Sequence, residues 1–450
     1  MGFPKDFIWG AAAASYQIEG ASLADGKGLS VWDMFCKRPG AVKNGDTGDI
    51  ACDHYYRYKE DVGIMKEIGL KAYRMSLSWP RIIPDGYGRV NEKGLDFYDR
   101  LVDELLGCGI TPYITLFHWD YPYELYKRGG WLNPDSPKWF QEYTRVVVDR
   151  LSDRVTNWMT LNEPQCFIIL GHYDGVHAPG LKLDKKDLFQ AIHNSLLAHG
   201  RSVEAIRKYS KRPCQIGYAP CGIVFFPDTN SDDDIHAAKT AMFSCREHTL
   251  WTNTWWMDPV YLGRYPEDGY KYYEQWLPEI KQDDFAVISQ PLDFFGCNIY
   301  YGTRVRSNGT GYEEVKRETG YAQTSTKWAV TPEALYWGPK LFYERYKKPV
   351  IITENGMANT DWVSIDGKVH DPQRIDYLYR YIRELKKAPI DGTGIKGYFT
   401  WSIMDNFEWA LGYSERFGLV YVDYVTQERI LKDSAYWYKD VIKSNGEIIK

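Results

Sequence analysis

The sequence lacks the patterns that mark several classes of protein. No stretch is apolar enough to cross a bilayer. No block of like charge suggests a nucleic-acid arm or a polybasic membrane patch, and a net charge of −5 indicates no particular charged partner. We therefore expect no nucleic-acid and no membrane partner. The oligomeric state is left open.

Paired cysteines and a secretory signal are also missing. The eight cysteines are scattered without a Cys-x-x-Cys pair, which predicts buried thiols rather than zinc ligands or disulfides. The opening Met-Gly-Phe-Pro-Lys-Asp has neither the charged segment nor the cleavage pattern of a signal peptide. We expect a cytoplasmic protein.

A glycine-rich phosphate turn is missing, which argues against an open Rossmann-like sheet. Instead, short apolar runs rich in β-forming residues recur, and each is followed by a longer segment of helical periodicity. The runs are Phe7–Ser15, Ala72–Trp79, Thr111–Trp119, Asn157–Pro164, Gln215–Cys221, Asp293–Tyr301, Pro349–Gly356 and Gly397–Asp405. Helical spacing of apolar residues marks Tyr55–Leu70, Glu92–Cys108, Pro137–Val155, Asp187–Tyr209 and Pro372–Lys387.

Eight such alternations predict an α/β fold, a closed (β/α)8 TIM barrel. No linker or repeat divides the chain, so we expect residues 1–450 to form a single domain with elaborated βα loops. The least regular stretch, Arg304–Lys327, is predicted to be a long loop after the sixth strand. Loops at the carboxyl ends of barrel strands form the active-site face, so this one should shape the pocket mouth.

Aromatic residues are abundant, with 17 tryptophans and 36 tyrosines. Most must lie in the core, since each buries a large apolar area. Rings with a polar edge also suit the apolar faces of sugars, which modestly favours a carbohydrate ligand.

Two glutamates stand where predicted strands stop. The fourth run ends Thr160-Leu-Asn-Glu-Pro164 and the seventh ends Ile352-Thr-Glu-Asn-Gly356. At such positions Glu163 and Glu354 should face the barrel axis at the catalytic end. Either could instead cap a helix or pair with an arginine. Two on separate strands, each beside an asparagine, favour a functional pair.

Paired carboxylates facing one cavity suit glycoside hydrolysis, in which one protonates the leaving oxygen and the other attacks the anomeric carbon. The acid must keep its proton near neutral pH, and a neighbouring anion in a partly desolvated cleft raises its pKa. The nucleophile must stay ionised. Arg74, in the second run, is a candidate for the cation that favours this, although a structural ion pair is an equal alternative.

From Phe7 to the segment Ala435–Val441 the chain resembles glycoside hydrolase family 1, the β-glucosidase family. The resemblance rests on FIWGAAAASYQIEG at Phe7–Gly20, TLNEP at Thr160–Pro164 and VIITENG at Val350–Gly356. It implies a retaining β-glucosidase with Glu163 as general acid/base, Glu354 as nucleophile, and no metal or other cofactor. The expected partner is a small carbohydrate substrate with a terminal β-linked glucosyl, or a galactosyl or fucosyl, residue.

The resemblance also implies a sugar-binding shell. Its members are Gln17, His118, Trp119, Asn162, Asn298, Tyr300, Trp328, Trp401, Glu408 and Trp409. Gln17, Glu408 and Trp409 would hold the far hydroxyls, and Trp328 would be a platform for the leaving group. Taken singly, His118 and the tryptophans would more often be core residues.

Two features separate members of the family. Enzymes acting on 6-phosphorylated sugars lose the acidic residue that stands here as Glu408, and they carry a lysine in the following segment, which here reads GYSERFG. An unphosphorylated sugar is therefore favoured over a 6-phospho-β-glycoside. Tyr121 and the Trp328-Ala-Val-Thr-Pro332 segment depart from the family pattern and leave the leaving-group subsite open.

Three further functions are compatible with the sequence. A sugar-binding barrel could keep the pocket without the chemistry, although both carboxylates argue against it. A metal-dependent hydrolase could use His54, His118, His172 and His177, but no His-x-His or HExxH spacing supports one. A glycosyl-enzyme could also transfer its sugar to a second sugar instead of water.

Overall fold

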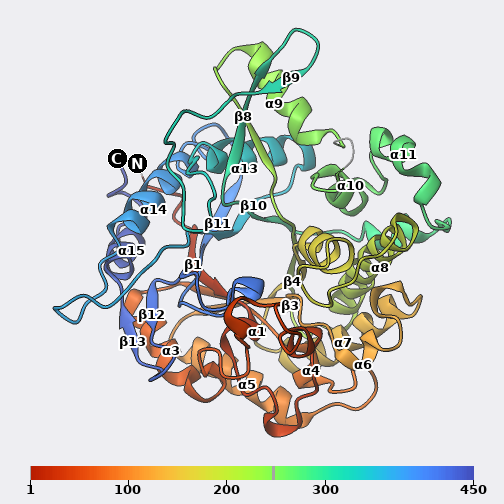
Figure 1. Ribbon diagram of the computed structural model, residues 1–450, viewed down its shortest axis with the longest axis vertical. Coiled ribbons are helices and arrows are strands. Elements are labelled where there is room, and N and C mark those ends of the chain that lie inside the picture. Colours follow the sequence, from red (N-terminus) through yellow and green to blue (C-terminus); the bar gives the residue numbers. More distant parts are fainter. Residues whose placement is uncertain (1, 246–248) are drawn as a thin grey trace.

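The computed structural model describes residues 2–245 and 249–450. Within these residues, eight parallel strands close into a barrel in the order β1-β11-β10-β7-β5-β4-β3-β2 (Figure 1). They are β1 (Ile8–Ala13), β2 (Ala72–Ser76), β3 (Thr111–Phe117), β4 (Asn157–Asn162), β5 (Gln215–Ala219), β7 (Phe294–Asn298), β10 (Val350–Asn355) and β11 (Ile395–Trp401). The predicted (β/α)8 barrel is confirmed, and each predicted run contains most or all of one of these strands.

The barrel strands are buried almost throughout, as expected when helices cover a parallel sheet. Most of them end earlier than the apolar runs predicted. Trp79, for example, lies beyond the end of β2 and begins the short helix α4 (Trp79–Ile82). The segments that follow the strands carry side chains of the cavity described below.

The main helices surround the barrel (Figure 1). They are α3 (His54–Ile68), α5 (Glu92–Gly107), α7 (Ser136–Leu151), α8 (Lys185–Tyr209), α10 (Thr254–Leu262), α13 (Ala334–Tyr346), α14 (Pro372–Leu385) and α15 (Asp433–Lys443). In α5 the buried side chains recur at three- and four-residue spacing, as Leu95, Tyr98, Leu101, Val102 and Leu105 show. No helix among the described residues is long and apolar enough to cross a membrane.

Further helices lie in the connections. They are α1 (Ser15–Ile18), α2 (Val31–Phe35), α6 (Tyr123–Tyr126), α9 (Asp232–Phe243), α11 (Glu267–Tyr273) and α12 (Asp284–Ile288). A π-helical segment, Cys166–Tyr173, follows β4. Such segments are frequent at functional sites.

The segment Arg304–Lys327 corrects one prediction, because part of it is a β-hairpin rather than irregular loop. β8 (Gly302–Ser307) pairs antiparallel with β9 (Tyr312–Glu314) and parallel with β6 (Val224–Pro227). Asn308 makes the turn, and its side-chain oxygen accepts from the Gly311 backbone N–H at 2.8 Å. Glycine and asparagine at this point were therefore turn signals. A second two-stranded sheet joins β12 (Val420–Val422) to β13 (Arg429–Leu431).

The eight cysteines are all free, but not all are buried as predicted. Cys36, Cys52, Cys166 and Cys297 are buried, whereas Cys108, Cys214, Cys221 and Cys245 are half-buried.

The two ends of the described chain meet where the barrel closes. β1 pairs with β11, and the Trp9 indole N–H donates to the Asn445 side-chain oxygen at 2.9 Å. In Figure 1 the N and C labels stand side by side.

Candidate active site

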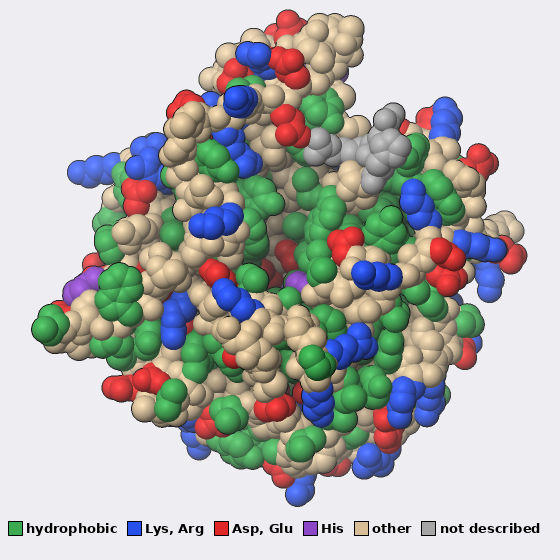
Figure 2. Space-filling view, in the orientation of Figure 1, with side chains coloured by type: hydrophobic (Ala, Val, Ile, Leu, Met, Phe, Trp, Pro, Cys, Tyr) green, Lys and Arg blue, Asp and Glu red, His purple; other side chains and the backbone are tan. Residues whose placement is uncertain are grey.

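A cavity of about 410 Å³ opens at the carboxyl ends of the barrel strands. Figure 2 shows this face hollowed near its centre, with acidic side chains and a histidine inside the hollow. The cavity is lined by ten of the predicted site residues: His118, Trp119, Glu163, Asn298, Tyr300, Trp328, Glu354, Trp401, Glu408 and Trp409. The other three, Arg74, Gln17 and Asn162, are buried behind the lining and contact it.

Glu163 is the first residue after β4. Its backbone N–H donates to Ala219 on β5 at 2.8 Å, and its φ of +42° is unusual for a residue with a side chain. Its Oε1 accepts from the Asn298 amide at 3.0 Å, and its Oε2 accepts from the Cys166 thiol at 3.3 Å. Burial, and then the neighbouring charge of Glu354, raise the pKa of Glu163 to about 7. This carboxyl group can therefore hold a proton near neutral pH.

Glu354, on β10, has different partners. Its Oε1 accepts from Arg74 Nη1 at 2.5 Å, and its Oε2 accepts from the Tyr300 hydroxyl at 2.6 Å. Burial raises the pKa of Glu354, but the Arg74 charge and the Tyr300 hydrogen bond oppose that rise. Among the described residues no cation contacts Glu163 directly, so Glu354 is the carboxyl group better stabilised as an anion.

A buried hydrogen-bond network fixes these groups. The Asn162 side-chain oxygen accepts from Arg74 Nη2 at 2.7 Å and from the Asn298 amide at 3.0 Å. The Asn162 amide lies 3.0 Å from Nε2 of His118. Burial, and then the Arg74 charge, lower the pKa of His118 well below its usual value, so the ring is neutral. Nε2 then accepts, and the ring proton sits on Nδ1.

The inner end of the cavity joins segments from both ends of the sequence. Gln17, in α1, donates from its amide to the Phe407 carbonyl at 2.8 Å and to Glu408 at 3.4 Å. The Gln17 side-chain oxygen is buried and has no hydrogen-bond partner among the described residues. Burial, then Glu354 and then Glu415, raise the pKa of Glu408 to about 8. The inner end therefore holds polar groups whose hydrogen-bonding capacity is satisfied only in part by the described residues.

Aromatic rings form the inner walls. The rings of Trp119 and Trp409 lie 4.5 Å apart between centroids, and His118 stacks 5.6 Å from Trp401. Trp119, Trp401 and Trp409 are each less than a tenth exposed. The cavity thus combines flat apolar faces with buried polar atoms, the composition that suits a sugar ring.

The mouth is built differently. Trp328 packs against Tyr300 at 5.0 Å and Tyr301 at 5.8 Å between centroids. Gly302 and Thr303 line the cavity here, but the body of the predicted loop Arg304–Lys327 does not. The prediction that this stretch shapes the mouth is therefore wrong except at its flanks, because its hairpin joins the outer sheet with β6.

Several lining residues were not predicted. They are Cys166, Leu170, His177, Cys221, Gly222, Ile223, Val224, Trp251, Tyr301, Gly302, Thr303 and Leu411. Cys166 could have been found from its place three residues after Glu163, just beyond the Thr160–Pro164 motif. The others come from loops whose course no local pattern specifies.

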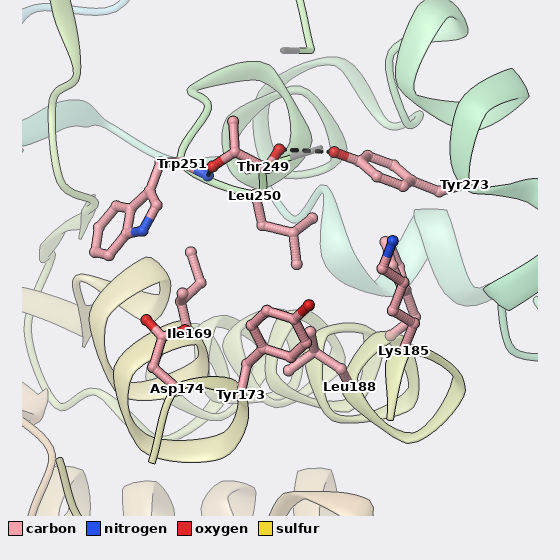
Figure 3. Close-up of a pocket in the computed structure, with 10 residues that line it drawn as sticks. Ile169, Tyr173, Asp174, Lys185, Leu188, Thr249, Leu250, Trp251 and Tyr273 are labelled. Atoms are coloured by element: carbon pink, nitrogen blue, oxygen red, sulfur yellow. Dashed lines mark hydrogen bonds between the residues drawn. The ribbon is translucent and has the colours of Figure 1, made fainter. Parts of the chain in front are cut away.

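A second cavity of about 200 Å³ adjoins the first, and Trp251 lines both. Figure 3 shows its mainly apolar lining, with Ile169, Tyr173 and Leu188 facing Leu250. Asp174 is the carboxylate among its lining residues. The smaller cavity thus offers one carboxylate among its described lining residues, whereas Glu163 and Glu354 both line the larger one.

The histidines do not form a metal site in the described part of the chain. His54 pairs with Asp61 at 2.7 Å, and Nδ1 of His172 lies 2.9 Å from the Phe167 carbonyl. His118 and His177 line the catalytic cavity, but no group of three or more His, Cys, Asp or Glu residues in residues 2–245 and 249–450 is arranged to hold a metal ion.

Comparison with known proteins identifies relatives along the full length. The model of glycosyl hydrolase family 1 matches residues 1–447. Beta-glucosidase A of Thermotoga maritima is 50% identical over 446 residues, covering 99% of this chain and 98% of the relative. The 1,4-beta-D-glucan glucohydrolase of Thermotoga neapolitana is 50% identical, covering 99% of each. A structure of the T. maritima β-glucosidase with glucoimidazole superposes with a TM-score of 0.90 at 49% identity, covering 99% of each chain.

Proposed function

The chain belongs to glycosyl hydrolase family 1, and on that premise we propose that it is a retaining β-glucosidase that releases terminal β-linked glucosyl residues. The observation that carries the proposal is the pair Glu163 and Glu354 in one cavity with unlike surroundings. Glu163 contacts uncharged donors, whereas Glu354 contacts a guanidinium and a phenol. A double displacement needs this asymmetry.

In the first step the Glu354 carboxylate attacks the anomeric carbon while Glu163 gives its proton to the glycosidic oxygen. The bond to the leaving alcohol breaks, and a glycosyl ester of Glu354 forms. In the second step the ionised Glu163 takes a proton from a water molecule, which attacks the anomeric carbon and releases the sugar. Arg74 and Tyr300 stabilise Glu354 as a nucleophile and again as a leaving carboxylate.

The sugar ring would occupy the inner end. Gln17 and Glu408 offer acceptors for far hydroxyls, while His118 and Asn162 face those nearer the bond. Trp401 supplies an apolar face, and Trp119 and Trp409 close the wall. Hydrogen bonds that tighten as the oxocarbenium ion forms lower the barrier selectively. Asn298, which donates to Glu163, orients the acid, and Trp328 supports the leaving group at the mouth.

Neither a 6-phospho-β-glycosidase nor a sugar-binding barrel without catalysis is favoured. A 6-phosphate would lie beside Glu408, and its charge would be repelled once that group ionises. A binding protein without chemistry would not need two carboxylates with opposed environments. The relatives named above carry the names of hydrolases.

Domain organisation and location belong to the same proposal. The whole chain would act as a single catalytic domain, supported by the contact of Phe3 and Trp9 with Asn445. A cytoplasmic location is supported by the eight free thiols, since reduced cysteines suit a reducing compartment.

The test is a kinetic comparison over p-nitrophenyl β-glucoside, β-galactoside, β-fucoside and β-glucoside 6-phosphate, together with cellobiose. We expect the β-glucoside and cellobiose to be cleaved and the 6-phosphate to be refused. Proton NMR of the first-formed sugar should show the β-anomer, as retention requires. The α-anomer as first product would overturn the mechanism, and preference for the 6-phosphate would overturn the substrate.

A further inference from the structure

The thiol of Cys166 touches the carboxyl group of Glu163. Cys166 begins the π-helical segment after β4, and its backbone N–H donates to the Glu163 carbonyl at 2.9 Å, which fixes the spacing of the two residues. Its Sγ lies 3.3 Å from Oε2, the oxygen that Asn298 does not bind. The thiol also lines the catalytic cavity. Each oxygen of Glu163 therefore faces one donor, an amide at Oε1 and a thiol at Oε2.

A second thiol stands beside the first. Cys221 also lines the cavity, and its backbone is held by Gln165, which donates to the Cys221 carbonyl at 3.0 Å and accepts from its N–H at 3.2 Å. This double contact keeps Cys221 next to the start of the π-helical segment. Both thiols line the cavity, and the interaction with Cys221, ahead of burial, raises the pKa of the Cys166 thiol. Cys166 thus has one proton and two acceptors, the Glu163 carboxyl oxygen and the Cys221 sulfur.

The proposed mechanism needs Glu163 in two charge states. It is a carboxylic acid before the glycosidic bond breaks and a carboxylate afterwards. A fixed strong donor would favour the carboxylate throughout and hinder the first step. A thiol is a weak donor that rotates about one bond, so it can serve either state.

We infer that Cys166 is a positioning residue for the acid/base, donating to Glu163 when that group is ionised and turning to Cys221 when it is protonated. The inference rests on the proposed role of Glu163. No bond is made or broken in the change, because the thiol proton stays on sulfur. In this way the pair Cys166 and Cys221 keeps both charge states of Glu163 accessible during one turnover.

Other charged and titratable side chains besides the thiols also influence the protonation of Glu163. Among the described residues, the charged and titratable side chains that line the cavity with Glu163 or contact its partners are Arg74, His118, His177, Tyr300, Tyr301, Glu354 and Glu408. None of them changes in the variants proposed below. A change in the pH profile can then be assigned to the thiols.

The experiment follows the alkaline limb of kcat/KM for p-nitrophenyl β-glucoside between pH 5 and 9, which reports the acid in the free enzyme. Cys166→Ala removes the donor to the carboxylate, so the limb should move up by about 0.5 pH unit. Cys166→Ser supplies a stronger donor and should move it down. Cys221→Ala removes the alternative acceptor for the Cys166 thiol, which destabilises the protonated state of Glu163. The alkaline limb should therefore move to lower pH, by a smaller amount than in Cys166→Ser.

A second readout separates positioning from structure. With 2,4-dinitrophenyl β-glucoside, whose leaving group needs little protonation, kcat should fall in Cys166→Ala because the Glu163 carboxylate is then less well oriented as a base. Cys166→Ser should restore it. Cys297→Ala, a buried cysteine on β7 without contact to Glu163, is the matched control and should leave the limb in place.

Unshifted limbs in both Cys166 variants, with activity merely lowered, would overturn the inference and indicate a packing role. If Cys166→Ala does not fold, the downward shifts expected of Cys166→Ser and Cys221→Ala remain decisive. The variant Glu163→Gln tests the acid role of Glu163 separately from the role of Cys166. An alkaline limb near pH 7 that persists in Glu163→Gln refutes the role of Glu163 as the acid. A limb that vanishes in Glu163→Gln but does not shift in the cysteine variants refutes only the inference about Cys166.

Discussion

The inner end and the mouth of the catalytic cavity are held together by different forces. At the inner end, Gln17 and Glu408 belong to a buried hydrogen-bond network, and Trp401 and Trp409 are each 4% exposed. At the mouth, Trp328 is held by ring packing, and Tyr301 and Leu411 are each 40% exposed.

The difference predicts unequal selectivity along the substrate. A buried polar site rejects a ligand that leaves its groups unpaired, by factors of about 10⁴ in favourable cases. A half-exposed apolar surface discriminates by only about 1–3 kcal/mol for a methylene group. The enzyme should therefore be strict about the sugar ring and permissive about the leaving group.

The largest effect should come from Glu354→Gln, which breaks the chemistry shared by both regions. Turnover should fall at least about 10⁴-fold for any leaving group, because no carboxylate remains to form the glycosyl ester. The measurement is kcat for 2,4-dinitrophenyl β-glucoside, with Glu384→Gln on α14 as a control outside the cavity. A Glu354→Gln enzyme that keeps a percent of its turnover would contradict the assignment.

Glu163→Ala should divide substrates by their leaving groups. Loss of the acid should cost about 10²–10⁴-fold in kcat/KM for phenyl β-glucoside and far less for the 2,4-dinitrophenyl compound. In the unaltered enzyme, kcat/KM for phenyl β-glucoside should fall as pH rises through about 7, where Glu163 loses its proton. Equal losses for both substrates, or a limb unrelated to Glu163, would remove it from the acid role.

Glu408→Gln tests the strictness of the inner end. The variant should lose about 10²-fold in kcat/KM for the β-glucoside, with a smaller loss for a substrate that lacks the hydroxyl concerned. p-Nitrophenyl β-xyloside, which lacks the exocyclic CH₂OH, and the 4-deoxy-β-glucoside serve as partners for this comparison. Uniform losses for all three sugars would show that Glu408 does not select hydroxyls.

The same variant has a consequence for stability. The folded protein raises the pKa of Glu408 from 4.5 to about 8. Stability associated with this group is thus fully present below pH 4.5 and is lost as pH rises through about 8. Glu408→Gln should raise the Tm relative to the unaltered protein at pH 8.5 more than at pH 5. Equal shifts at both pH values would contradict the direction of the pKa change.

Trp328→Ala should have the smallest effect of these variants. It tests whether the mouth of the cavity acts independently of the inner end that selects the sugar. Loss of the Trp328 ring should raise KM for p-nitrophenyl β-glucoside by up to about tenfold and leave the ranking of glucoside, galactoside and fucoside unchanged. Leu411→Ala, which also alters a lining residue, should change KM less. A changed sugar ranking in Trp328→Ala would mean that the two regions are not independent.

The sequence predicted the parts of this molecule that depend on local periodicity and on strand ends. Eight apolar runs correspond to eight barrel strands, and Glu163 and Glu354 stand where two of those strands stop. The β8–β9 hairpin was missed because its strands are short and partly exposed, without the alternation of a longer half-buried strand. The mouth residues were missed because Trp251 and Leu411 reach the cavity only through the tertiary course of their loops.

The contact between Gln17 and Glu408 spans 391 residues of sequence, and the strands that precede these two residues, β1 and β11, complete the barrel by pairing with each other. During synthesis the amino-terminal part of the barrel leaves the ribosome while β11 is still unmade. A nascent chain can thus carry Glu163, and later Glu354, without a closed pocket around them. Sugar recognition should appear late and abruptly in translation, when the last strand docks against the first.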